Sequence, residues 1–385
     1  MIQFVRSRTH CLAFALCVVS VSYLPASAAP LVGPSPLDRF ILTQMQRSHT
    51  SGLSAVIVKD GTIAWQGAYG FRDAAATLPV MPDTLFELAS LSKTVLAVAV
   101  LQLVEQGRLA LDNDVSTALP FKVRNPNYPD RPITLRMLLG HVSSIVDNWP
   151  VIKAHSVENA DAPVSLRDWF SGYLTSGGIW YSKEANFARN APGTVFTYSN
   201  QAAALSALAV EGAGGEFFDR YCRDHIFMPL GMSETSYRLA ELDPSRIAIP
   251  QAWDSDGFVE LGHHGFPDYP AGTLRTSAPQ LARFLLMVMN GGEYLGVRLL
   301  APAMVRQMLT PQYPSLDPAI GMLWFIIPQD SDVIIGHEGE DPGVNTLMYF
   351  RPKDQVGVIV LSNGNSRFPA THVVAARLFD EAAHL

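Results

Sequence analysis

The chain has 385 residues, of which 48% are hydrophobic and 16% are charged, and its formal net charge is −7. This composition excludes a disordered chain, and its 28 glycines follow no fixed period, which excludes a collagen-like one. The length suits one large domain or two closely packed ones, because single cores stop growing at about 250 to 300 residues.

The first 28 residues have the pattern of a secretory signal peptide. Arg6 and Arg8 precede an apolar run over 12–24, and Ala26-Ser27-Ala28 supplies a cleavage site. The run is shorter than the about 20 apolar residues of a relaxed membrane span. We therefore expect an exported protein, periplasmic or secreted, with no membrane span after cleavage; an uncleaved anchor is the alternative.

The mature chain would carry a net charge of −9, because the two arginines leave with the signal. Nucleic acids and anionic lipid surfaces demand a basic face, so we expect neither as a partner. Cys11 and Cys17 also leave, and only Cys222 remains, which we expect to be buried. No intramolecular disulfide is then available, and the oligomeric state stays open.

The predicted elements begin with two strands, 53–58 and 62–65, joined by a tight turn at Asp60-Gly61. The segment 94–105 is apolar on nearly every face, which predicts a buried helix that stops at Gly107. Further helices are expected at 135–141, 166–174, 201–210, 217–227 and 278–289. The chain closes with strands at 322–327, 333–336, 347–351 and 356–361 and a helix at 371–383.

Strands at both ends and helices between them predict an α+β fold, with an antiparallel sheet flanked by helices and an inserted, mostly helical domain. Within residues 29–385, the sheet part is expected at about 36–93 and 271–385, and the helical part at about 94–270.

Ser90 and Lys93 are separated by one helical turn at the start of the buried helix, so their side chains share a face. Unpaired backbone N–H groups at a helix start suit a developing oxyanion. Burial favours the uncharged amine of Lys93, which is then a suitable base for the serine. The alternative is a capping serine followed by a lysine that reaches solvent.

Tyr198 and Asn200 follow Pro192-Gly193 and begin another helix. A tyrosine can relay a proton between nucleophile and leaving group, and an amide can hold a substrate carbonyl. The alternative is a capping Ser199 with a packed tyrosine.

His337 and Gly339 end the apolar run 333–336, where the glycine would let a substrate approach the strand edge. A second His-x-Gly contains His264 and lies in a loop, so we prefer His337 and expect His264 at the rim.

Together these motifs are similar to those of the serine β-lactamase and penicillin-binding protein superfamily. They resemble most the branch with class C β-lactamases, D-alanyl-D-alanine carboxypeptidases, D-aminopeptidases and related esterases. The likeness runs from about 36 to 383 and includes the approach to the nucleophile, 83–90, and the segments Pro192-Gly193-Thr194, Pro229-Leu230-Gly231-Met232, Ala271-Gly272-Thr273 and 358–363.

The resemblance implies a β-lactamase/transpeptidase-like fold and an acyl-enzyme formed on Ser90. Lys93 and Tyr198 would share the proton transfers, Asn200 would orient substrate and Lys93, and His337 would replace the lysine of many β-lactamases. The backbone N–H groups of Ser90 and Glu340 would form the oxyanion hole. No metal or other cofactor is implied, and the sequence lacks a His-Glu-x-x-His motif and paired cysteines.

Glu338 departs from many relatives that bind a substrate carboxylate through a hydroxyl at this position. If Glu338 faced the site ionised, two like charges at about 4 Å would repel by about 4 kcal/mol at an intermediate dielectric. Good substrates would then be neutral esters or amides, or carry an amine. Alternatively Glu338 points away or pairs with a cation such as Arg275.

Aromatic side chains in 141–190, Trp149 among them, either shape a substrate pocket or fill a core. We count Trp149 as a candidate substrate contact and expect His141 to be structural. The leading hypothesis is an exported serine hydrolase acting on a small-molecule or peptide ester or amide. The alternatives are a D-alanyl-D-alanine carboxypeptidase or D-aminopeptidase, a weak β-lactamase, or a non-catalytic penicillin-binding-like scaffold.

Overall fold

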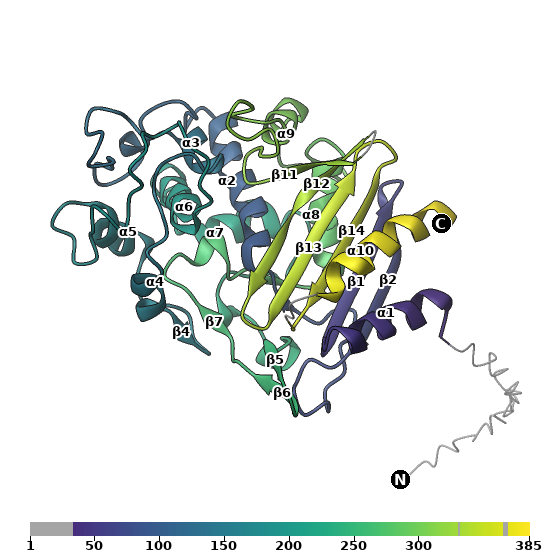
Figure 1. The fold of residues 1–385 in the computed structure, drawn as a ribbon. Helices are drawn as coiled ribbons and strands as arrows, with labels where there is room; N and C mark the ends of the chain where they lie inside the picture. Colours follow the sequence, from purple (N-terminus) through teal and green to yellow (C-terminus); the bar gives the residue numbers. More distant parts are fainter. Residues whose placement is uncertain (1–33, 330–331, 365–368) are drawn as a thin grey trace, which may run out of the picture.

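A six-stranded antiparallel sheet built from both ends of the chain organises the fold (Figure 1). The computed structural model describes residues 34–329, 332–364 and 369–385. The strand order is β11-β12-β13-β14-β1-β2. These strands are β1 (Gly52–Lys59), β2 (Thr62–Gly70), β11 (Phe325–Gln329), β12 (Asp332–Asp341), β13 (Val344–Arg351) and β14 (Val356–Ser362).

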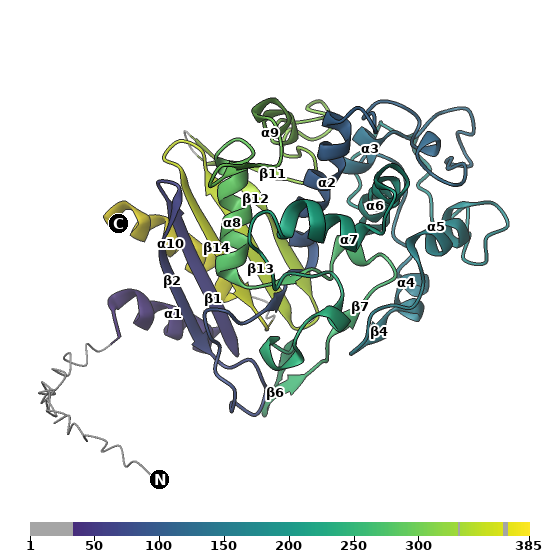
Figure 2. The same ribbon diagram turned by 180° about the vertical axis from the view of Figure 1, so that it is seen from behind.

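Helices cover both faces of this sheet. On the outer face α1 (Pro36–Arg47) and α10 (Ala370–Glu381) lie side by side, and α8 (Ala278–Met289) covers the opposite, inner face (Figures 1 and 2). Almost every residue of β1 is buried, as expected for a central strand with both faces covered. The predicted α+β architecture is confirmed.

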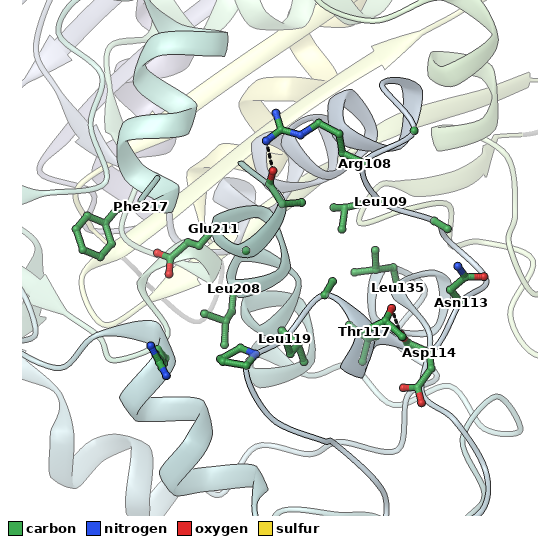
Figure 3. Close-up of a pocket in the computed structure, with 18 of the residues that line it drawn as sticks. Arg108, Leu109, Asn113, Asp114, Thr117, Leu119, Leu135, Leu208, Glu211 and Phe217 are labelled. Atoms are coloured by element: carbon green, nitrogen blue, oxygen red, sulfur yellow. Dashed lines mark hydrogen bonds between the residues drawn. The ribbon is translucent and has the colours of Figure 1, made fainter. Parts of the chain in front are cut away.

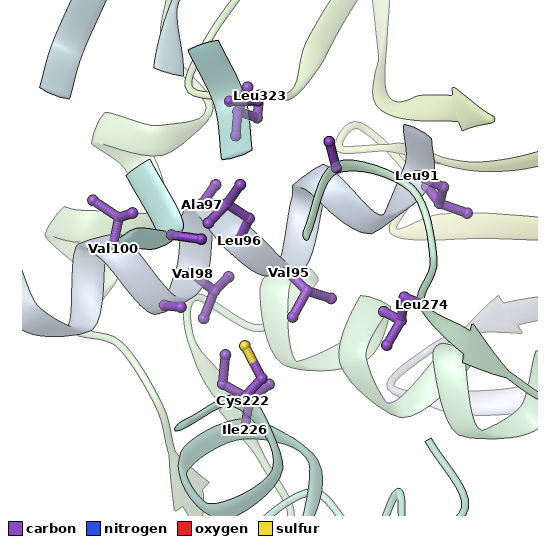
Figure 4. Close-up of a cluster of buried hydrophobic side chains, with 14 of the residues drawn as sticks. Leu91, Val95, Leu96, Ala97, Val98, Val100, Cys222, Ile226, Leu274 and Leu323 are labelled. Carbon is purple, nitrogen blue, oxygen red and sulfur yellow. The ribbon is translucent and has the colours of Figure 1, made fainter. Parts of the chain in front are cut away.

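The helical part lies beside the inner face and is built around α2 (Lys93–Glu105) and α6 (Asn200–Gly214) (Figure 1). Around them lie α3 (Leu135–Leu139), α4 (Trp149–His155), α5 (Leu166–Leu174) and α7 (Phe218–Cys222), which continues as a π turn over Arg223–Phe227. The first eleven residues of α2 are buried, as its all-round apolar sequence predicts. Cys222 is a free, buried thiol that packs beside Ile226 next to α2 (Figure 4).

Short elements complete the described chain. They are β3 (Phe86–Glu87) with β8 (Arg275–Thr276), β4 (Val157–Glu158) with β7 (His264–Gly265), β5 (Gln251–Asp254) with β6 (Gly257–Glu260), β9 (Glu293–Tyr294) with β10 (Val297–Arg298), and α9 (Pro302–Met308). Within the described ranges no helix is both long and apolar enough to cross a membrane.

Local sequence explains most element boundaries. Asp60 and Gly61 both have positive φ, which gives the β1–β2 hairpin the tight turn that was predicted. The expected strand at 322–327 begins three residues later, at Phe325, because Leu323 takes a left-handed φ of 56°. Helix α1 was not predicted, although its Ser35 and Asp38 form a capping box. The predicted signal peptide, residues 1–28, lies outside the described residues.

Candidate active site

Ser90 lies on a turn, η1 (Ala89–Ser92), that leads from β3 into α2. Ala89 has a left-handed φ of 49°, which is a strained conformation for a residue with a Cβ atom. The turn is tied to the sheet because the Thr346 hydroxyl donates a hydrogen bond of 2.7 Å to the Leu88 carbonyl. The serine is therefore held rigidly where the sheet meets the helical part.

Lys93 is fully buried and its Nζ atom donates to Ser90 Oγ at 2.8 Å. A second hydrogen bond of 2.7 Å runs from Nζ to the Ala271 carbonyl. The structure thus brings together the pair that the sequence singled out. It assigns the orientation of Lys93 to Ala271, whereas the sequence interpretation gave this task to Asn200.

Tyr198 joins this pair, since Lys93 Nζ lies 5.2 Å from the centroid of its ring. Asn200, the first residue of α6, instead donates its side-chain amide to Asp147 at 3.1 Å. Asp147 also accepts from the Ser199 hydroxyl and from the backbone N–H groups of Asn200 and Gln201. This carboxylate caps α6 and fixes Asn200 beside the site. Its sequence position offers little signal of this role, because Asp147 lies 53 positions before Asn200.

His337 is buried and lies on β12 directly after Gly336, the last residue of this strand that pairs with β11. Its Nδ1 contacts the Glu338 carbonyl, which can only accept, so Nδ1 carries the proton. Nε2 is then an acceptor, and it has no partner among the described residues. Burial, and then the nearby Lys93 charge, lowers the pKa of His337 to about 3, so the ring is uncharged at neutral pH.

Glu338 points away from His337 because successive strand residues face opposite sides of a sheet. It borders a small cavity of about 380 Å³ beside Ser90, but its carboxylate is engaged on the outer face. Tyr349 donates to it at 2.6 Å and His372 lies 2.9 Å away. Of the two alternatives left open by the sequence, the structure supports the one in which Glu338 points away from the acyl site and is paired, and its partner is His372 instead of Arg275.

Gly339 is required for packing against the turn that carries Ser90. A Cβ atom at this position would lie 2.0 Å from the Leu88 carbonyl oxygen and 2.5 Å from Thr346 Oγ1. Any side chain here would displace the turn that carries Ser90. The role in substrate approach that the sequence suggested for Gly339 stays a prediction.

Ser90 opens into a cleft of about 860 Å³ between the sheet edge and the helical part. Trp149, which is half exposed, and His264 lie on its wall, as predicted. Glu340 borders both this cleft and the small cavity, next to Ser90; its role in an oxyanion hole stays a prediction. Other aromatic side chains of the segment 141–190, such as Trp169 and Tyr173, fill the core.

Five carboxylic acids line this cleft, against one lysine and one histidine. The acids are Asp147, Glu158, Asp268, Glu340 and Asp341. Burial, and then Asp147, raises the pKa of Asp268 to about 7, and burial, and then Glu87, raises the pKa of Asp341 to about 7. The cleft is therefore a poor environment for an anion.

Behind the cleft lies a buried ion pair between Glu87 and Arg275, with an N–O distance of 2.7 Å. His264 Nδ1 lies 2.9 Å from the other oxygen of Glu87. Burial disfavours the charged ring, but the hydrogen bond to Glu87 and the nearby charges of Glu87 and Asp341 together outweigh it and raise the pKa of His264. Arg275 is thus engaged in holding the β3–β8 pair together beneath Ser90, and it does not line the cleft.

A second cavity of about 860 Å³ lies at the far end of α2 (Figure 3). Arg108, Leu208, Glu211 and Phe217 line it. Burial raises the pKa of Glu211 to about 7, but its carboxylate accepts the N–H of Phe218 and so caps α7. This cavity contains none of the Ser90 cluster, so the chemistry belongs to the cleft.

The fold and the Ser90–Lys93–Tyr198 arrangement define a member of the serine β-lactamase and penicillin-binding protein superfamily. The Beta-lactamase family model matches residues 37–383, and the chain belongs to that family. In the described residues no cluster of side chains suited to holding a metal ion occurs.

Three similar proteins illustrate the relationship. Protein flp of Staphylococcus aureus (strain N315) is 24% identical over 341 residues, which cover 86% of this chain and 63% of the relative. The octameric penicillin-binding protein homologue from Pyrococcus abyssi has a TM-score of 0.71 at 24% identity, over 90% of this chain and 76% of that one. The D-amino acid amidase from Ochrobactrum anthropi SV3, complexed with D-phenylalanine, has a TM-score of 0.70 at 20% identity, over 91% and 99%.

Proposed function

We propose that the protein is an exported serine hydrolase, related to class C β-lactamases, that cleaves esters or amides through an acyl-enzyme on Ser90. The observation that carries the proposal is the hydrogen bond of 2.8 Å between Lys93 Nζ and Ser90 Oγ at the floor of an open cleft. Lys93 is fully buried, and no carboxylate among the described residues forms an ion pair with it, so its place beside Ser90 and the Tyr198 ring has little structural purpose. This argues against a non-catalytic scaffold.

The chemistry follows the usual two steps of covalent catalysis. Ser90 Oγ attacks the acyl carbonyl carbon, and its proton passes to the amine of Lys93 or through Tyr198. The carbon–heteroatom bond then breaks, and the leaving amine or alcohol takes up that proton. Water attacks the acyl-serine ester in the second step, which releases the acid and restores Ser90.

The charge of the cleft selects among possible substrates. His337 is neutral, and among the described residues that line the cleft the basic side chains are Lys153 and His264. The His264 ring is already paired with Glu87, which leaves Lys153 as the unpaired basic side chain for a substrate carboxylate. The excess of acids over basic side chains in the cleft would repel it and would attract an ammonium group, even though Asp268 and Asp341, with pKa values of about 7, are only partly ionised at neutral pH. We therefore favour neutral or amine-bearing esters and amides over terminal D-alanine carboxylates and penicillins. The likeness to a D-amino acid amidase agrees with this preference.

Intact mass spectrometry tests the acylation directly. The protein is exposed briefly to a penicillin, a short-chain aryl ester and a D-amino acid amide, beside the variant Ser90→Ala. We expect an adduct with the ester or the amide in the parent protein and none in the variant. An adduct that persists in Ser90→Ala, or none in the parent with any compound, would reject the proposal.

Substrate charge is tested with three acyl esters of equal size that carry a neutral, an ammonium or a carboxylate group beside the scissile bond. We expect the carboxylate ester to react at least about tenfold more slowly than the ammonium ester. A tenfold difference corresponds to about 1.4 kcal/mol of free energy. The variant Asp268→Asn should bring the rates with the ammonium and carboxylate esters closer together, because it removes one acid from the cleft. A preference for the carboxylate would overturn the proposed selectivity.

Export is tested by expressing the full chain with its first 28 residues and sequencing the N-terminus of the folded product. Cleavage after Ala28 and recovery from the periplasm or the medium are expected. A product that keeps residues 1–28 would support the uncleaved anchor instead.

A further inference from the structure

His141 contacts the Tyr198 segment at three points, although the sequence suggested only a structural role for it. Its carbonyl accepts the N–H of Thr197 at 2.7 Å, and its ring Nδ1 accepts the N–H of Ser199 at 3.2 Å. These two residues are the neighbours of Tyr198 on either side. The ring of His141 itself stacks on the Tyr198 ring, with centroids 4.3 Å apart and planes at 30°.

The backbone of His141 is built for this arrangement. The residue follows the end of α3, is completely buried, and has a left-handed φ of 55°. That conformation is uncommon for a residue with a side chain, and here it lets one residue present both its carbonyl and its ring to the same segment.

The ring is uncharged and its tautomer is fixed. Burial, followed by the charge of Lys93, lowers the pKa of His141 well below its ordinary value. Because Nδ1 accepts from Ser199, the proton lies on Nε2, which has no partner among the described residues. The ring is thus held by Nδ1 and by its contact with Tyr198, and it adds no positive charge beside Lys93.

We propose that His141 is a positioning residue that holds the Tyr198 ring in its place beside Lys93 and Ser90. The inference rests on the proposed acylation of Ser90, in which Tyr198 moves a proton. A proton relay tolerates little displacement, because misplacing a catalytic group by about 1 Å can cost a hundredfold in rate. Loss of the His141 ring should therefore slow acylation without removing the reactive serine.

The variant His141→Asn separates this role from folding. Asparagine adopts the left-handed conformation readily and keeps an acceptor for Ser199, but it removes the ring. The matched control is His49→Asn, because His49 also has a left-handed φ, of 46°, and its ring stacks on Trp253 at 4.3 Å, away from the cleft. The acylation rate constant is measured with an aryl ester in a single turnover and is expressed per site that can be acylated.

We expect His141→Asn to lower this per-site rate at least about tenfold with nearly full stoichiometry, and His49→Asn to leave it unchanged. In a Tyr198→Phe background the same substitution should have almost no further effect, because His141 acts through the phenol. The proposal would be overturned if His141→Asn were acylated at the same per-site rate as the parent protein. It would also be overturned if His141→Asn lowered the rate equally in the parent and in the Tyr198→Phe background. A parent protein that forms no adduct would overturn the proposed function as well, which distinguishes the two failures.

Discussion

Lys93 Nζ donates to Ser90 Oγ at 2.8 Å while the Ala271 carbonyl holds the same nitrogen from behind at 2.7 Å. The first residue of α2 is thereby fixed against a segment 178 positions later in the chain. The pair is preorganised before any substrate arrives, so the free energy of binding is not spent on assembling it.

Replacing the amine should abolish most acylation. For Lys93→Met we expect the rate of acyl-enzyme formation to fall by at least about a hundredfold, because the base that accepts the serine proton is lost. Stopped-flow measurement with an aryl ester checks this, with near-UV circular dichroism to establish folding. The control is Lys59→Met, since Lys59 also donates to a backbone carbonyl, that of Ala382, but far from Ser90. A similar loss in both variants would contradict the role of Lys93.

His337 should act as a neutral hydrogen-bond acceptor at every pH where the enzyme works. Its pKa of about 3 places its titration far below neutrality. The variant His337→Gln keeps an acceptor and should lower kcat/KM by about ten- to a hundredfold, with the shape of the pH–rate profile unchanged between about pH 5 and about pH 9. An inflection near pH 6 that disappears in His337→Gln would show that the ring titrates in the working range.

The buried pair between Glu87 and Arg275 should dominate stability beneath the site. Arg275→Met leaves the carboxylate buried without its partner, and we expect it to lower the free energy of unfolding by about 3 to 5 kcal/mol. The double variant Glu87→Leu with Arg275→Met should recover much of that loss. For comparison, breaking the more exposed pair of Arg351 and Asp354 should cost no more than about 1 kcal/mol. Urea unfolding at neutral pH measures all three.

The sequence was sufficient for the sheet, the buried helix α2 and the Ser90–Lys93 pair, because each depends on local patterning or on spacing within one helical turn. The orientation of Glu338 was left open, since a strand residue can face either side until its register is known, and the packing role of Gly339 was not predicted. The roles of Ala271, Asp147 and His141 depend on contacts between segments far apart in the chain. A backbone carbonyl such as that of Ala271 also carries no signal in its residue type.

Asp341 should make the protein less stable as the pH rises. Its folded-state pKa is about 7, against 3.8 ordinarily, because burial and then the charge of Glu87 disfavour the ionised form. Between these values the folded state binds more protons than the unfolded state, so stability is lost as the pH rises through this window.

Asp341→Asn removes that group, so we expect the variant to match the parent near pH 4 and to exceed it by about 1 to 2 kcal/mol at pH 8. The control Asp354→Asn should behave oppositely, because hydrogen bonding to Arg351 lowers the pKa of Asp354 and its stabilisation is lost as the pH falls. Urea unfolding of the parent and both variants across this pH range gives the two slopes. If Asp341→Asn and the parent lose stability in parallel as the pH rises, the carboxyl is ionised in the folded protein from low pH, and Glu87 and burial do not hold its proton.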